Sequence, residues 1–342
     1  MSPRTSTLIA ARPLSAAWRG SAPILAASVM WGSTGTTASL APAGTPAAAI
    51  GSAGLALGGL LLYVTGRGGR QRLTPEPRNR LRSSAGGRFR VSSSERGLLL
   101  LGALAVAGYP VTFYPAVART GVAVATVIAL GSAPIFAGLL SWVLGRGRPT
   151  PRWCLATAMA VIGCALLVVG PELGASGNTI DPLGVLLAAG GGLSYAVYSQ
   201  IGGSLIARGH ASNTVMGNMF GLAAVVVLPV VVVSGPGWLA TPRGLAVALH
   251  LALFTTFLAY RLFGYGLRHT TVETATALTL AEPAVAALLG VTVVGERLPV
   301  LSWSGLAVLA LGLVLLTLPT RISDDEPSSA TRLRNEGATS AT

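Results

Sequence analysis

Apolar runs of 19 to 24 residues recur along nearly the whole of this chain, and each could cross a hydrocarbon core of about 30 Å as an α-helix. Their apolarity is continuous rather than confined to one stripe, so lipid or other helices should surround each helix. Only 10% of the 342 residues are charged, against roughly 25% in a soluble domain. The sequence therefore predicts an all-α integral membrane protein with ten transmembrane helices, at residues 22–41, 46–65, 97–118, 121–144, 153–171, 183–206, 214–234, 244–266, 274–295 and 300–319.

The basic residues, all 24 of which are arginine, predict the orientation of these helices. If both termini are cytoplasmic, 20 arginines lie on the cytoplasmic side, three lie outside and Arg261 lies within a span. Nine of the 20 fall in the 66–96 loop, which is expected to be disordered and held to anionic lipid headgroups. A binding tail for another partner is the alternative. The net charge of +13 then reflects topology, and no nucleic-acid partner is expected.

The N-terminal run could also be read as a signal peptide, because Arg4, Arg12 and Arg19 precede it and small residues end it near 38–41. Later segments need a first span to complete an even count of spans. The first helix is therefore expected to be retained.

The residue inventory argues against several kinds of site. The absence of lysine excludes a P-loop and all Schiff-base chemistry. Cys154 and Cys164 would lie about 15 Å apart along one helix, too far for a disulfide, and with the scattered histidines they show no zinc-ligand spacing. No HExxH or GxSxG motif occurs. We therefore expect neither an enzyme nor a metal or cofactor site.

The second half of the sequence repeats features of the first at a separation of about 150 residues. Pro134 in SAPIFAGLLSWVLG aligns with Pro283 in AEPAVAALLGVTVVG. Each repeat holds five spans, an odd number, so the two should insert with opposite orientations, as in many secondary transporters. The alignment also pairs Gly145, Pro149, Trp153, Tyr109, Tyr114 and Arg119 with Gly295, Pro299, Trp303, Tyr260, Tyr265 and Arg268.

The predicted organisation follows from this repeat. Residues 1–21 form a cytoplasmic tail, 22–171 the first five-helix repeat, 182–319 the second, and 320–342 a disordered cytoplasmic tail.

Two motifs resemble a known family. Trp31-Gly32 lies in the first span, and the ninth carries Glu282-Pro283 followed by Gly295-Glu296-Arg297-Leu298. This pattern is similar to that of the EamA-type branch of the drug/metabolite transporter superfamily. The resemblance implies a multi-pass protein of the bacterial inner membrane that exports amino acids or other small metabolites. The first repeat departs from the pattern, because Ala133 and Arg146 stand where the two glutamates would be.

Ionisable residues inside spans are the first candidates for transport, since placing one at the bilayer centre costs about 2.5–3.5 kcal/mol. Glu282 lies deep in its span and could contact substrate or take up and release a proton. Its alternative role is to bond backbone groups freed by Pro283. Arg261 could contact an anionic group of a substrate, or its side chain could reach the headgroups or another helix. Tyr265 is four residues further along the same face, and Glu273 fits a first-turn acid.

Aromatic residues within the spans form the second group of candidates. A tyrosine hydroxyl in mid-span needs a polar partner, which suggests a polar interior. Gln200 is a weaker candidate, with its side chain expected to be mostly solvated. The candidates for substrate contact are Trp31, Tyr109, Tyr114, Tyr195, Tyr198, Arg261, Tyr265 and Glu282.

These features predict a gradient-driven transporter that exports a small-molecule substrate by alternating access. Uptake or exchange remains open, as does a scaffold or sensor built on the same fold, and a homodimer is possible.

Overall fold

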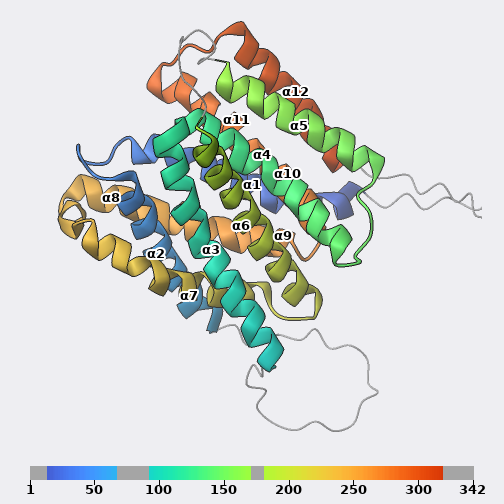
Figure 1. The fold of residues 1–342 in the computed structure, drawn as a ribbon, viewed down its shortest axis with the longest axis horizontal. Helices are drawn as coiled ribbons and strands as arrows, with labels where there is room; N and C mark the ends of the chain where they lie inside the picture. The colour runs from blue at the N-terminus through green and yellow to red at the C-terminus, as the bar shows by residue number, and fades with distance from the viewer. Residues whose placement is uncertain (1–13, 68–91, 171–180, 319–342) are drawn as a thin grey trace, which may run out of the picture.

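The computed structural model describes residues 14–67, 92–170 and 181–318, and these ranges are helical throughout apart from turns and short connections (Figure 1). The two ends of the predicted 66–96 loop are helical, because residues 66–67 belong to one helix and 93–96 to the next. The rest of that loop, residues 68–91, lies outside the described ranges, as do the 172–180 connection and the C-terminal tail at 320–342. Nine segments of the described chain are long and apolar enough to cross a membrane. The longer helices are α1 (Leu14–Ala38), α2 (Ala47–Arg67), α3 (Ser93–Thr120), α4 (Val122–Val143), α5 (Pro151–Val169), α6 (Pro182–Ala207), α7 (Ser212–Val233) and α12 (Val300–Thr317).

The first helix differs from its prediction. It begins at Leu14, within the segment expected to be a tail, and it contains Pro23. It is not among the nine apolar segments, although it packs on helices of the second half of the chain. Ten transmembrane helices therefore remain a prediction, with α1 as the tenth.

Two predicted spans consist of several helical pieces. The eighth is formed by α8 (Pro242–His250), the π-helical η3 (Leu251–Leu258) and α9 (Ala259–Gly266), after a short helix η2 (Pro236–Ala240). The ninth is formed by α10 (Val272–Leu278), α11 (Ala281–Leu289) and the π-helical η4 (Gly290–Val294).

The break between α10 and α11 lies beside Glu282. Proline has no backbone N–H, so Pro283 cannot donate to the carbonyl of Thr279 four residues earlier. That carbonyl instead accepts the Glu282 N–H at 2.9 Å, which tightens the turn. Pro134, at the aligned position of the first repeat, lies inside the unbroken α4. The two halves therefore differ at the position where only the second carries a glutamate.

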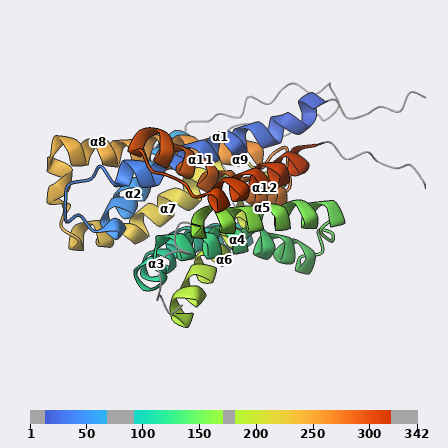
Figure 2. The same cartoon turned by 90° about the horizontal axis from the view of Figure 1, so that it is seen from above.

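The helix pairings follow the predicted repeat. α2 packs on its counterpart α7 and α5 on its counterpart α12, side by side in Figures 1 and 2. α3 and α4 of the first repeat pack on α6 of the second. Their counterparts η3, α9 and α11 in the second repeat pack on α1, the counterpart of α6 in the first. The aligned Gly145 and Gly295 both follow the helix end with positive φ, 69° and 81°, a conformation that glycine adopts without steric cost.

Successive spans run in opposite directions, which places the end of α3 and the start of α6 on one side of the bundle. Polar contacts join helix ends that lie on the same side. Arg119, at the end of α3, pairs with Asp181, before α6, at 3.0 Å. His210, before α7, lies 3.0 Å from Glu95, in the first turn of α3. The hydrogen bond from Arg119 holds the pKa of Asp181 below its usual range. We call the two sides the Arg119 side and the Glu95 side.

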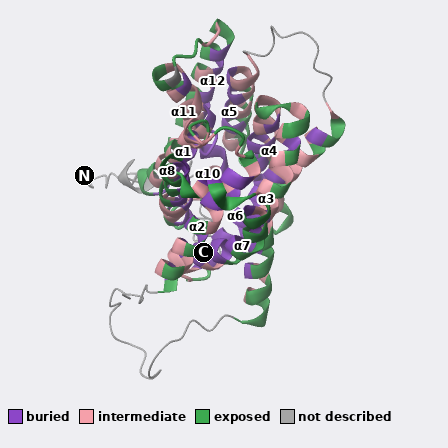
Figure 3. Cartoon of the chain, turned by 90° about the vertical axis from the view of Figure 1, so that its left-hand side faces the viewer, coloured by how far each residue is buried: buried purple, intermediate pink, exposed green. Residues whose placement is uncertain are grey.

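Burial is distributed as expected for a membrane bundle. Buried residues gather toward the interior of the bundle, and exposed ones cover the outward faces of the helices (Figure 3). Many of the outward residues are large and apolar, among them Leu186, Val225 and Val233 at 68%, 68% and 86% exposure. Such a surface favours lipid rather than water as its surroundings.

Glycines set the closest helix contacts. A Cβ at Gly163 of α5 would overlap the backbone N of Leu309 in α12, and one at Gly217 of α7 would lie 2.6 Å from the carbonyl oxygen of Leu62 in α2. Gly54 and Gly58 of α2 face Leu251 and Thr256 of η3. Backbone approaches of this kind require small residues.

We expect Gly163→Val to destabilise the protein by about 1–3 kcal/mol, the usual cost of overpacking, because the neighbouring atoms are backbone and cannot rotate away. Gly97→Ala is the control, because the space around Gly97 is open: apart from its own helix, no atom lies within 4 Å of where a Cβ would be. Thermal unfolding in detergent measures both variants. Equal melting temperatures would contradict the α5–α12 contact.

Candidate functional site

Aromatic side chains from both halves meet in the middle of the bundle. Trp31 of α1 lies 5.0 Å from Tyr260 and 5.7 Å from Phe263 of α9, measured between ring centroids. The Tyr198 hydroxyl of α6 shares a 3.0 Å hydrogen bond with that of Tyr260. We call this set the central aromatic cluster; its members are Trp31, Tyr195, Tyr198, Phe220, Tyr260 and Phe263.

Trp31 is fixed by a hydrogen bond to the backbone of the eighth span. Its indole N–H donates to the carbonyl oxygen of Thr255 at 2.8 Å, within the π-helical η3. π-Helical segments are rare and often occur at functional sites. Gly32, the next residue, packs against α11, where a Cβ would lie 2.6 Å from the Cβ of Val285. The Trp31-Gly32 pair therefore ties α1 to both interrupted spans.

Trp31→Phe should cost about 1–3 kcal/mol of stability, because it leaves the buried Thr255 carbonyl without its donor. Trp18→Phe, in the same helix, is a matched control, since Trp18 is 50% exposed. Thermal unfolding of the two variants tests this. A Trp31→Phe melting temperature equal to that of the control would show that the bond contributes nothing.

A chain of hydroxyls leads from the cluster to the helix break. The Tyr195 hydroxyl donates to Oγ1 of Thr279 at 3.0 Å, and Thr279 donates to the carbonyl of Thr276 at 2.7 Å. Tyr195 and Thr279 are both buried. The cluster is thus connected to the turn that precedes Glu282.

Glu282 is half-buried beside this turn. Its carboxylate makes no side-chain hydrogen bond or ion pair with any residue that the structure describes. It lies within electrostatic range of the hydroxyls of Tyr109, Tyr195 and Tyr260. An unpaired carboxylate away from bulk water is costly, since such groups normally have a partner.

Tyr109 and Tyr114 occupy different surroundings on α3. Tyr109 stacks on Phe113 with centroids 5.4 Å apart, packs against the core and lies within electrostatic range of Glu282. Tyr114 packs on α2, where a Cβ at Gly51 would overlap its hydroxyl. Tyr109 is therefore grouped with Glu282, and Tyr114 is not.

Arg261 and Tyr265 lie along one side of α9, outside the cluster. The Arg261 guanidinium carbon is 5.3 Å from the ring centroid of Phe257, one turn further from Arg268. The Arg261 side chain thus points away from the Arg268 end of α9, which is the nearer end of the span. A side chain reaching for the headgroups would point toward that end. Tyr265 is 42% exposed and Arg268 lies 5.9 Å from its ring.

A network of polar side chains lies on the Glu95 side of the bundle. Gln200 of α6 donates to Oγ of Ser141 in α4 at 2.7 Å and to the Ala137 carbonyl at 2.9 Å. Arg146 donates to Oε1 of Gln200 at 2.7 Å, and Ser141 donates to Oε2 of Glu273 in α10 at 3.1 Å. We call this set the α4–α6–α10 network; its members are Ser141, Arg146, Gln200, Ser204 and Glu273.

The network corrects one sequence prediction. Gln200 was expected to be mostly solvated, but only 3% of it is exposed, because α4 covers the end of α6 on which it lies. Arg146, noted only as a departure from the family pattern, is its hydrogen-bond donor. No periodicity in the sequence could reveal this set, since its members come from separate helices and a turn.

Within the described part of the chain no group of three or more metal-ligating side chains lies together.

Comparison with known proteins decides the family. The model of the EamA-like transporter family matches this chain twice, over residues 18–169 and again over 182–318. The chain belongs to the EamA-like transporter family. Membership, together with its apolar helices, makes it a multi-pass membrane protein of a transporter family.

Relatives in this family are named as transporters. The chain is 35% identical over 298 residues to the "Uncharacterized transporter YwfM" of Bacillus subtilis, covering 87% of this chain and 93% of the relative. It is 28% identical over 228 residues to the "Threonine/homoserine exporter RhtA" of Salmonella typhimurium, covering 66% and 70%. A crystal structure, described only as that of a protein, matches with a TM-score of 0.69 at 18% identity, over 86% of this chain and 95% of that chain. That likeness supports the fold alone.

Proposed function

We propose that this chain is a gradient-driven exporter of amino acids or related small metabolites, working by alternating access. The observation that carries the proposal is Glu282, whose carboxylate has no partner among the described residues and lies beside a helix break, next to aromatic side chains from both halves. A broken helix at the contact of two repeats is where secondary transporters bind substrate. The similarity to exporters of threonine and homoserine supports the direction and the substrate class.

The proposed site consists of the cluster residues Trp31, Tyr195 and Tyr198, together with Tyr109 and Glu282. The carboxylate would bind the ammonium group of an amino acid through a charge-assisted hydrogen bond. Alternatively, it would release a proton when the substrate binds. The tyrosine hydroxyls supply donors and acceptors for the polar end of the substrate. Arg261, Tyr114 and Tyr265 lie outside the central aromatic cluster and are assigned no direct contact.

The proposed membrane arrangement has ten transmembrane helices in the bacterial inner membrane, with both termini cytoplasmic. The Glu95 side is then cytoplasmic, in agreement with the excess of arginine on that side. In this proposal the α4–α6–α10 network closes that side, which would keep substrate from entering from the cytoplasm. In the opposite state, each repeat would take up the arrangement that the other has in this structure, which would open the Glu95 side and close the Arg119 side.

Efflux from cells tests the proposal. Bacteria expressing the chain are loaded with radiolabelled threonine or homoserine, and efflux is followed after dilution. We expect faster efflux than from cells with an empty vector. Net accumulation in place of efflux would favour uptake, and no change for a panel of amino acids would favour a scaffold or sensor.

A further inference from the structure

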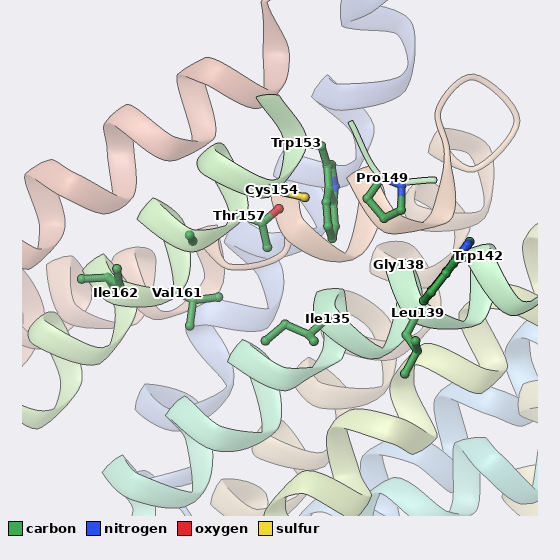
Figure 4. Close-up of a pocket in the computed structure, with 11 residues that line it drawn as sticks. Ile135, Gly138, Leu139, Trp142, Pro149, Trp153, Cys154, Thr157, Val161 and Ile162 are labelled. Atoms are coloured by element: carbon green, nitrogen blue, oxygen red, sulfur yellow. The ribbon is translucent and has the colours of Figure 1, made fainter. Parts of the chain in front are cut away.

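A groove lies on the outer surface of the bundle between α4 and α5, apart from the proposed transport site (Figure 4). Its volume is about 520 Å³, within the range of about 300–1,000 Å³ that is common for small-molecule sites. It is apolar along almost its whole surface. The walls used in the argument are Ile135, Leu139 and Trp142 of α4 and Trp153, Ala158 and Ile162 of α5.

The groove runs along the two helices. On α5 it extends from Trp153 to Ile162, about 13 Å at 1.5 Å per residue. Both helices are membrane-crossing candidates, so the groove has the direction of a lipid acyl chain. Ile135, Trp142 and Ile162 are 56%, 52% and 55% exposed, which places this surface toward the surroundings of the bundle.

One end of the groove is positively charged. Trp142, Pro149 and Trp153 line that end, next to the α4–α5 connection, which carries Arg146 and Arg148, and to Arg152 at the start of α5. Arg146 donates to the α4–α6–α10 network, and Arg152 donates to carbonyls of Leu315 and Leu318 in and just after α12. Arg148 is exposed, lies 5.8 Å from the Trp142 ring, and has no acidic partner among the residues that the structure describes.

We propose that this groove is a binding site for an anionic phospholipid, with one acyl chain between α4 and α5 and the phosphate at Arg148. An apolar groove with an exposed cation at one end matches the two parts of such a lipid. A second copy of the chain fits less well. A two-fold axis along the membrane normal would bring the arginine-bearing turns of two copies together at the same depth, with like charges opposed.

Lipid-dependent thermal stability tests this site. The purified full chain in detergent is titrated with phosphatidylglycerol or phosphatidylcholine carrying the same acyl chains, and the apparent affinity is taken from the rise in melting temperature. We expect phosphatidylglycerol to bind more tightly than phosphatidylcholine. Arg148→Gln should weaken phosphatidylglycerol about fivefold, the effect of one cation near a lipid surface, and leave phosphatidylcholine unchanged.

Ala158→Phe tests the acyl-chain part, because Ala158 is exposed on the groove wall and a ring there would fill the groove. It should weaken both lipids. Two matched controls should leave both affinities unchanged: Ala310→Phe on the exposed face of α12, and Arg67→Gln, whose guanidinium lies 4.4 Å from the Tyr63 ring. The proposal is overturned if the two lipids bind equally to the unmodified chain, or if the controls lose affinity as much as the groove variants.

Discussion

Glu282→Gln is expected to reduce export at least about tenfold while the protein still folds and reaches the membrane. Glutamine keeps the size of the side chain but cannot carry charge. Hydrogen bonds to a charged group contribute about 1.5–3 kcal/mol, which corresponds to roughly a tenfold to hundredfold loss of affinity for an ammonium group. Folding should be little affected, since no described residue depends on this carboxylate for a hydrogen bond.

The same variant separates the two roles of Glu282. If the carboxylate carries the coupled proton, Glu282→Gln should abolish the response of flux to a pH gradient. If it only binds substrate, the KM should rise and the response should remain. Asp181→Asn is the control, because Asp181 lies at a helix end in an ion pair with Arg119. Unchanged flux in Glu282→Gln, with an unchanged pH response, would remove Glu282 from the mechanism.

Gln200→Leu is expected to open the Glu95 side of the bundle. The change removes three hydrogen bonds of a buried side chain, to Ser141, Ala137 and Arg146, at about 0.5–1.5 kcal/mol each. Even the lower estimate shifts the balance between closed and open states about tenfold. Leucine is close to glutamine in size, so the packing around α6 should be retained.

Accessibility to a thiol reagent measures this opening. In a background with Cys154 and Cys164 replaced, Ala137→Cys places a thiol where the structure is fully buried. Its reaction with a membrane-impermeant maleimide, applied in inside-out vesicles, should be about tenfold faster in Gln200→Leu. The control is Thr214→Val, which removes the hydrogen bond from Thr214 to the Gly66 carbonyl on the same side without touching the network. Equal rates in both variants would show that the network does not close this side.

The sequence was sufficient for the class of fold, because a membrane span must be long, apolar and helical. The repeat was also recoverable: aligned Gly145 and Gly295 both follow the end of their helical segment with positive φ. The start of α1 was missed, since residues 14–21 are not apolar enough to appear as part of a span. A proline alone does not predict where a helix breaks. The helix is interrupted at Pro283, whereas the equivalent Pro134 leaves α4 unbroken.

Part of the proposed site was a prediction from the sequence for a similar reason. A charged residue stands out in an apolar run, which made Glu282 a candidate, and position in mid-span made Trp31, Tyr195 and Tyr198 candidates. Their role in substrate contact stays a prediction. Which aromatics meet depends on how helices are rotated, and this separated Tyr109 from Tyr114 and placed Tyr265 at an exposed position. The α4–α6–α10 network needed the tertiary structure, because Gln200 and Glu273 meet Ser141 only through packing.

Flux in proteoliposomes containing only the purified chain shows whether this protein transports amino acids without a partner and without ATP. Vesicles loaded with labelled threonine or homoserine are diluted into label-free buffer, with and without an imposed proton gradient. We predict release faster than from empty vesicles, and much slower release with Glu282→Gln. Release at the rate of empty vesicles for every amino acid tested, from protein shown to be folded, would contradict the proposed function.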